Sequence, residues 1–116
     1  MTLALVIPVW NDPDGVQSVL EQAADLGCFD QIILSDDASE PPLEHPAQTD
    51  DLPVEIVRGA TQGGAGAARN LGLAQVRCSH VLFFDSDDYL LSPLAHLWQR
   101  LQGRHFDFCI FKHIEE

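Results

Sequence analysis

Short apolar runs, separated by polar segments and by segments rich in glycine or proline, recur along the chain. Continuous apolar runs of this length, bounded by turn-forming residues, are typical of strands buried in a parallel sheet. We expect a fully buried strand at residues 3–7, a strand buried on both faces at 81–84 and another buried strand at 32–34. The same pattern predicts strands at residues 54–57 and 106–114.

Helix signals lie between these runs. Asp12 suits an N-cap and Pro13 the first helical position, and apolar residues at helical spacing follow until Gly27. This pattern predicts a helix of roughly three turns that ends at the glycine. A similar cap-plus-proline pair at residues 92–93 opens another helix, in which Trp98 belongs to the apolar stripe. We expect Trp98 in the core.

A glycine-rich segment at residues 59–66 precedes a run of small residues at 67–74 that predicts a further helix. The segment is neither a P-loop nor the dinucleotide-binding fingerprint. Glycines between a strand and a helix often serve only close packing. They also allow the backbone to approach a ligand at the free N–H groups of a helix N-terminus. Both interpretations stay open from this segment alone.

Strands that alternate with helices predict a parallel sheet with right-handed crossovers and helices on both faces. The 116 residues suffice for one such domain. Loops that follow parallel strands emerge at one edge of the sheet, where open α/β sheets hold their ligands. Residues 10–12, 36–37 and 85–88 would meet there. This convergence favours a ligand site.

Three carboxylates, Asp85, Asp87 and Asp88, follow the apolar run at residues 81–84. Carboxylates without partners repel one another and are costly to bury, so we expect them at the exposed end of the strand. Such a group suits a hard divalent cation, Mg²⁺ or Mn²⁺, that also binds phosphate oxygens. The alternative is a solvated acidic turn that caps the next helix.

Composition narrows the choice of partners. The formal net charge is −12, which disfavours binding to nucleic acid and to anionic lipid surfaces.

No apolar run approaches membrane-spanning length, and the first residues lack the features of a signal peptide. Cys28, Cys78 and Cys109 are isolated, as is typical of buried, reduced thiols. We expect a cytoplasmic protein.

Four motifs occur in order: VIPVWND at residues 6–12, SDDAS at 35–39, GGAGAARNLG at 63–72 and FDSDD at 84–88. Together they resemble the nucleotide-sugar-binding half of an inverting family 2 glycosyltransferase with the GT-A fold. The resemblance implies a Rossmann-like α/β/α sandwich of three layers, with a mostly parallel sheet that is truncated after the D-x-D region. It makes residues 1–116 a single donor-binding domain without the acceptor-binding half.

The resemblance also implies roles for matching residues. Trp10 would stack near the nucleobase, and Asp37, with Asp36 beside it, would accept a base N–H, commonly that of uracil. Asp85 would meet the ribose, and Asp87 would bind a divalent cation on the diphosphate. The implied substrate-binding residues are Pro8, Trp10, Asn11, Asp36, Asp37, Gly64, Arg69, Asp85 and Ser86, and the implied metal ligands are Asp85 and Asp87. Asp88 would orient the site or cap the following turn, and Arg69 could equally pair with the motif acids.

The chain departs from the family after the D-x-D motif. Full members supply there an acceptor pocket and a carboxylate base, and inversion needs such a base on the far side of the sugar. Asp107, Glu115 and Glu116 lie in no recognisable acceptor-side motif, so the catalytic base stays unassigned. We expect the chain by itself to bind a UDP-sugar and to transfer little of it to its acceptor, a saccharide, lipid-linked glycan or protein.

Two other functions compete with this interpretation. A phosphatase of the haloacid dehalogenase type also uses an apolar strand ending in D-x-D with Mg²⁺, but on its first strand and with Thr or Val after the motif, where this chain has Asp88 and Tyr89. A binding module could keep the fold without catalysis. An exposed apolar sheet edge could then support a homo-oligomer.

Overall fold

Strands and helices alternate along the chain in the computed structural model, which describes residues 1–46, 52–88 and 93–102. The elements are, in chain order, β1 (Leu3–Val9), α1 (Pro13–Leu26), β2 (Gln31–Asp36), β3 (Val54–Arg58), α2 (Ala65–Leu73), β4 (His80–Phe83) and α3 (Pro93–Leu101). Within the described residues, the strands form a four-stranded sheet in the order β3-β2-β1-β4, and every neighbouring pair is parallel.

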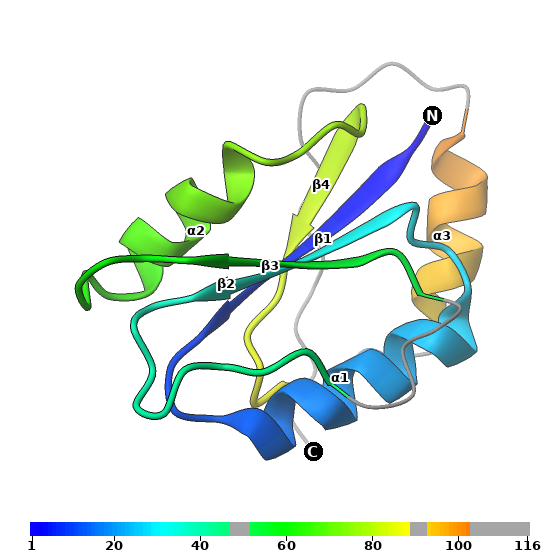
Figure 1. Ribbon diagram of the computed structural model, residues 1–116. Coiled ribbons are helices and arrows are strands. Elements are labelled where there is room, and N and C mark those ends of the chain that lie inside the picture. Colours follow the sequence, from blue (N-terminus) through cyan, green and yellow to red (C-terminus); the bar gives the residue numbers. More distant parts are fainter. Residues whose placement is uncertain (47–51, 89–92, 103–116) are drawn as a thin grey trace.

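Helices cover both faces of this sheet (Figure 1). On one face, Leu5 and Ile7 of β1 pack with buried residues of α1, and Leu94 of α3 packs against the same cluster. On the other face α2 lies so close that a Cβ atom at Gly72 would come within 2.6 Å of a Val6 methyl group. The predicted three-layer α/β/α arrangement with a parallel sheet is confirmed.

The boundaries of α1 agree with the sequence signals. One Asp12 carboxylate oxygen accepts the N–H of Gly15 at 3.1 Å, and Pro13 is the first helical residue. Gly27 ends the helix in the left-handed region at φ 65°, and its N–H donates to the Ala23 carbonyl. The helix has 14 residues, slightly longer than expected. Its start matters for function because Asp12 also reaches the candidate site.

The strand β4 is less buried than its sequence predicts. The run at residues 81–84 was expected to be buried on both faces, yet Phe83 is 39% exposed and Leu82 is half-buried. Among the described strands, β4 pairs with β1 alone and lies at an edge of the sheet. An apolar run does not by itself distinguish an edge strand from a central one, since the number of neighbours is a tertiary property.

Other elements differ from expectation mainly in their bounds. The helix α2 begins at Ala65, and β2 continues to Asp36, which pairs with Val9 of β1. Trp98 is 8% exposed, as expected of a core residue. Its ring packs edge-on against the ring of His80, with the two ring centroids 5.5 Å apart. The strand expected at residues 106–114 lies outside the described residues, as do Cys109 and Ser92 of the helix-opening pair, whereas Pro93 is the first residue of α3, as expected.

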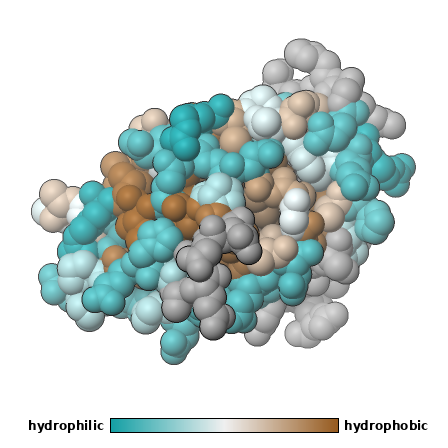
Figure 2. Space-filling view, turned by 45° about the vertical axis from the view of Figure 1, so that its right-hand side comes forward, coloured by the Kyte–Doolittle hydropathy of each residue, from teal (hydrophilic) through white to brown (hydrophobic). Residues whose placement is uncertain are grey.

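Apolar side chains also reach the surface. Figure 2 shows apolar groups gathered on one face and bordered by hydrophilic ones. The exposed large apolar residues of the described chain are Met1, Trp10, Leu73 and Phe83. None of the described helices is both long and apolar enough to cross a membrane. Self-association through an apolar sheet edge stays a prediction.

Gly72 tests the close packing of α2 on the sheet. Gly72→Ala would place a Cβ atom 2.6 Å from a Val6 methyl group and 3.4 Å from the Ser35 Cβ. We expect this overpacking to lower the free energy of unfolding by about 1–3 kcal/mol. The matched control is Gly66→Ala in the same helix, because a Cβ atom there meets nothing within 4 Å.

The control should be neutral or stabilising, by up to about 1 kcal/mol, since alanine favours the helix over glycine. Urea denaturation of both variants measures the difference. Equal stability of the two variants would contradict the packing of α2 described above.

Candidate functional site

A pocket of about 340 Å³ opens at the carboxyl end of the sheet, where the loops after β1, β2 and β4 meet the start of α2. It is lined by Pro8, Val9, Trp10, Asp12, Asp37, Ala65, Ala68, Asp85, Ser86 and Asp87. The loops meet because β1 pairs in parallel with both β2 and β4. The pocket therefore lies at the edge where the sequence predicted a ligand site.

The structure brings together most of the residues implied by the sequence. Pro8, Trp10, Asp37, Asp85, Ser86 and Asp87 line the pocket, whereas Asn11, Asp36, Gly64 and Arg69 do not. Four lining residues, Val9, Asp12, Ala65 and Ala68, were not among the implied ligands. Asp12 had been expected as a helix cap and within the converging segment 10–12, but not as a ligand. Ala65 and Ala68 lie in a run of small residues that in itself carries no functional signal.

The loop after β1 presents an aromatic ring. Trp10 is 52% exposed although it lines the pocket, so its face is available to a flat ligand. Asn11 follows in the left-handed region at φ 51°, which asparagine tolerates better than most residues. Its N–H donates to the Ser39 hydroxyl, and its side-chain oxygen accepts the N–H of Glu40. Asn11 thus ties the loop after β1 to the loop after β2.

Asp36 is buried and fully engaged within the protein. One oxygen accepts the Arg58 guanidinium at 2.8 Å and the Leu43 N–H at 3.0 Å, and the other accepts the Ser39 N–H at 3.1 Å. Burial by itself would raise the pKa of Asp36, but the hydrogen bonds from Ser39 and Leu43 and the charge of Arg58 lower it below its ordinary value. These contacts indicate a structural role. The implied contact of Asp36 with a base stays a prediction.

Asp37 holds the glycine-rich loop. Its two carboxylate oxygens accept the N–H groups of Gly63 and Gly64, each at 2.8 Å. Gly64 has φ 91°, a conformation that favours glycine, and it is the N-cap residue of α2. Gly63 packs closely, since a Cβ atom there would lie 2.8 Å from the Ala67 Cβ, and α2 starts at the pocket with Ala65. Approach of this backbone to a ligand stays a prediction.

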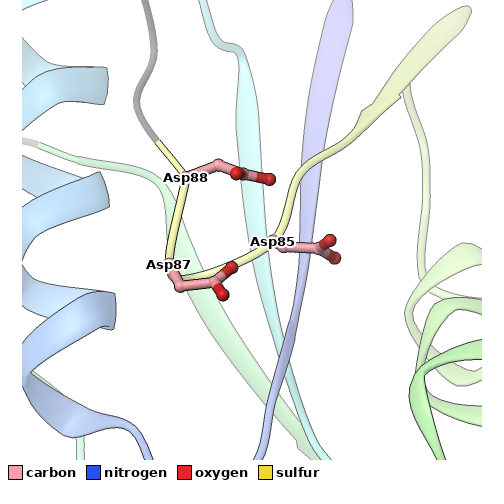
Figure 3. Close-up of side chains that lie close together, drawn as sticks. All are labelled: Asp85, Asp87 and Asp88. Carbon is pink, nitrogen blue, oxygen red and sulfur yellow. The ribbon is translucent and has the colours of Figure 1, made fainter. Parts of the chain in front are cut away.

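The acids after β4 form a tight turn. The Asp88 N–H donates to the Asp85 carbonyl at 3.2 Å, and Figure 3 shows the three carboxylates on one side of the turn. One oxygen from each of Asp85, Asp87 and Asp88 lies within 4.8 Å of the others. Three carboxylate oxygens at this spacing fit Mg²⁺ or Mn²⁺, both of which prefer oxygen ligands. This grouping agrees with the cation site expected from the three carboxylates, and it keeps Asp88 among the candidate ligands although the family resemblance implied a different role for it.

Asp85 is not unpaired, contrary to the expectation for this cluster. The Arg69 guanidinium lies 3.1 Å from one Asp85 oxygen, and both side chains are partly exposed. Arg69 comes from α2, so the ion pair joins the acidic turn to the helix that starts at the pocket. The sequence had left Arg69 open between a ligand contact and this structural pairing.

The family model described as "Glycosyl transferase family 2" matches residues 4–115. The chain belongs to this family. The match covers the described elements except Leu3, the first residue of β1, and includes every residue that lines the pocket. A curated relative, a poly(ribitol-phosphate) beta-glucosyltransferase of Bacillus spizizenii strain W23, is 30% identical over 107 residues. The alignment covers 84% of this chain and 17% of the relative.

Solved structures of glycosyltransferases share the fold. TarS of S. aureus (residues 1–349) matches with a TM-score of 0.72 and 24% sequence identity. A mannosyltransferase of Pyrobaculum calidifontis in complex with GDP-Man and Mn²⁺ matches with a TM-score of 0.72 and 18% sequence identity. They cover 90% and 88% of this chain. Glucosyl-3-phosphoglycerate synthase of Mycobacterium tuberculosis, with Mn²⁺, UDP and glucosyl-3-phosphoglycerate, has 0.57 at 22% and covers 88%. The chain spans 32% to 38% of these three structures.

Asp36→Asn should destabilise the fold without removing a pocket residue. The amide cannot form the ion pair with Arg58, so the free energy of unfolding at neutral pH should fall by about 2–3 kcal/mol, a modest value because Arg58 is partly exposed. The native pKa is lowered, so this contribution is present above the unfolded pKa of about 4 and is lost as pH falls through the native pKa.

Urea denaturation at a series of pH values measures this effect. The difference between wild type and Asp36→Asn should be constant at neutral pH and should shrink as the pH falls below about 4. A difference that does not change over this range would contradict the contribution of the ion pair.

Proposed function

We propose that this chain is the donor-binding part of an inverting glycosyltransferase and binds a nucleotide-diphospho-sugar, a UDP-sugar in the first instance, through a divalent cation. The observation that carries the proposal is the placement of the acidic turn beside Trp10 and Asp37 in one pocket. An aromatic face for a base and carboxylates for a cation are the two features that such a donor requires.

The charge of the pocket supports the need for a cation. Asp12, Asp37, Asp85 and Asp87 line it, and Arg69, the cation nearest to the turn among the contacts described, already pairs with Asp85. A diphosphate would be repelled by these carboxylates in the absence of a counter-ion. Mn²⁺ accompanies the nucleotide ligands in the Pyrobaculum and Mycobacterium structures. We propose Mn²⁺ or Mg²⁺ on Asp87 with Asp85, and with Asp88 as an additional ligand.

The base is proposed to lie between Trp10 and Asp37. Trp10 offers an exposed ring for stacking. Each Asp37 oxygen already accepts one glycine N–H, and a carboxylate oxygen can accept a second donor, such as the N–H of uracil. One structure of the shared fold carries UDP and another GDP-Man, so the fold itself suits both bases. The assignment of uracil rests on the resemblance at Asp37.

The chemistry of transfer follows from the donor. The diphosphate departs with developing negative charge, and a bound cation supplies electrostatic stabilisation of that charge. The ion pair between Arg69 and Asp85 orients the acidic turn. Trp10 and Asp37 would hold the nucleoside, so that the sugar of the donor lies in a fixed position. Inversion also requires a general base for the acceptor hydroxyl, and we assign no residue to it.

The acceptor and the activity of a complete enzyme are also proposals, because the chain spans only about a sixth to two fifths of the length of its relatives. The name of the Bacillus relative makes poly(ribitol phosphate) the first acceptor to test. The free thiols of Cys28 and Cys78 suit the reducing cytoplasm that we propose as its location. A phosphatase is not proposed because the chain belongs to glycosyl transferase family 2.

Asp87→Ala tests the metal-dependent donor site. Calorimetric titration of UDP and GDP into the wild type should show binding that requires Mn²⁺, with UDP the tighter ligand. Removal of the Asp87 carboxylate should weaken this binding at least about tenfold, since a charged ligand of the cation is lost. Asp25→Ala is the matched control, because it removes an exposed carboxylate from the far end of α1. Binding that is independent of metal, or equal loss in both variants, would contradict the proposal.

Trp10→Ala tests the base-stacking surface separately from the metal. The ring is half exposed, so its loss should leave the fold intact and reduce UDP affinity in Mn²⁺ by about 1–3 kcal/mol, the usual value of stacking on an aromatic side chain. Trp10→Phe should retain part of the affinity. The affinity for Mn²⁺ alone should not change in either variant. Unaltered UDP binding by Trp10→Ala would place the base elsewhere.

A further inference from the structure

The acidic turn is held to the first turn of α1 by a hydrogen bond between two side chains. Ser86 lies in the middle of the turn, and its hydroxyl donates to one Asp12 carboxylate oxygen at 2.8 Å. The other Asp12 oxygen accepts the N–H of Gly15 and caps α1. One carboxylate therefore joins the loop after β1 to the loop after β4, which are 74 residues apart.

Glycine at position 15 permits this contact. A Cβ atom there would lie 2.6 Å from the Ser86 carbonyl oxygen and would also collide with the Asp12 carboxylate. Real Cβ atoms do not come this close to a backbone oxygen, so any larger residue would displace the turn or the helix start. The close approach of the acidic turn to α1 thus depends on the absence of a side chain.

The turn is anchored on two sides. Arg69 holds the Asp85 carboxylate from α2, and Asp12 holds Ser86 from α1. Among the described contacts, no hydrogen bond or ion pair engages the side-chain oxygens of Asp87 or Asp88. The two anchors therefore hold the first half of the turn, and the side chains of Asp87 and Asp88 are exposed.

We infer that Asp12 and Ser86 are positioning residues: their hydrogen bond preorganises the acidic turn for the divalent cation, and Ser86 does not serve as a direct ligand contact. This inference rests on the proposed function, because it concerns the same cation. Holding the carboxylates in place before binding removes part of the entropy lost when a cation orders them. It gives Asp12 a role beyond its helix cap, and it replaces the substrate contact that the sequence implied for Ser86.

A double-mutant cycle on Mn²⁺ affinity tests the inference. Ser86→Ala removes the hydroxyl and leaves the helix cap intact, and we expect Mn²⁺ to bind roughly tenfold more weakly, as for loss of one hydrogen bond to a charged group. Asp12→Ala removes the acceptor altogether and should show at least as large a loss. The double variant should be no weaker than the weaker single variant, because both changes break the same hydrogen bond.

Control variants separate positioning from stability. Ser86→Thr keeps a hydroxyl and should recover most of the affinity. Ser18→Ala removes a hydroxyl that contacts Gln22 on α1, away from the pocket, and should change nothing. The midpoint temperature of thermal unfolding should be lowered by Asp12→Ala, which removes the cap of α1, and should change little in Ser86→Ala.

The outcomes distinguish this inference from the proposed function. If the wild type binds neither Mn²⁺ nor UDP, the proposed function fails and the inference fails with it. If the wild type binds both, additive losses in the cycle, or wild-type Mn²⁺ affinity in Ser86→Ala, would overturn the inference alone. A loss of UDP affinity in Ser86→Ala without a loss of Mn²⁺ affinity would restore Ser86 as a direct contact to the nucleotide.

Discussion

Parallel pairing of β1 with both of its neighbours is the constraint on which the site depends. The register places Val9 beside Asp36 at the end of β1 and β2, and β4 runs in the same direction on the other side of β1. Because parallel strands end at one edge, their three following loops meet around the end of β1. An antiparallel β4 would carry the acidic turn to the opposite edge, away from Trp10. The strand topology therefore determines where the pocket lies, and the side chains determine its chemical character.

Side-chain hydrogen bonds then connect the loops that the sheet brings together. Asn11 reaches the loop after β2, Asp37 reaches the glycine-rich loop, and Asp12 reaches the acidic turn. Each bond uses a short polar side chain on a backbone or hydroxyl donor across a gap between separate segments. Short acids and amides suit this task because they accept several hydrogen bonds with little loss of side-chain entropy. The polar residues of this edge therefore build the pocket as well as line it.

Much of this arrangement could be predicted from the sequence, and the remainder depends on tertiary neighbours. The start of α1 was predictable because Asp12 and Pro13 act within one turn of the chain. The different partners of Asp36 and Asp37 were not, since two adjacent aspartates look equivalent until the structure pairs the first with Arg58 and the second with the N–H groups of Gly63 and Gly64. Period-two alternation does indicate that neighbours at a strand end point to opposite sides. It does not indicate which of the two faces the pocket.

The edge position of β4 shows a similar limit. Its apolar run resembles that of a central strand, yet Phe83 is partly exposed in a strand that pairs on one side within the described chain. Ser86 was a second limit, because nothing near it in the sequence identifies Asp12 as its acceptor. A sequence motif does not identify hydrogen bonds between its residues and residues of distant loops. These hydrogen bonds can be identified only in the folded structure.

The electrostatics of the acidic turn explain why anchoring matters. Three carboxylates with oxygens within 4.8 Å repel one another, by about 1 kcal/mol per pair even in water, and the chain as a whole carries a formal charge of −12. A turn without anchors would relieve this repulsion by spreading apart, and a cation would then have to draw the acids together again. The Arg69 and Asp12 contacts oppose such spreading from opposite sides. Acidic clusters are common on protein surfaces, and what distinguishes this one is that side chains of two other segments, Arg69 and Asp12, hold two of its residues in place.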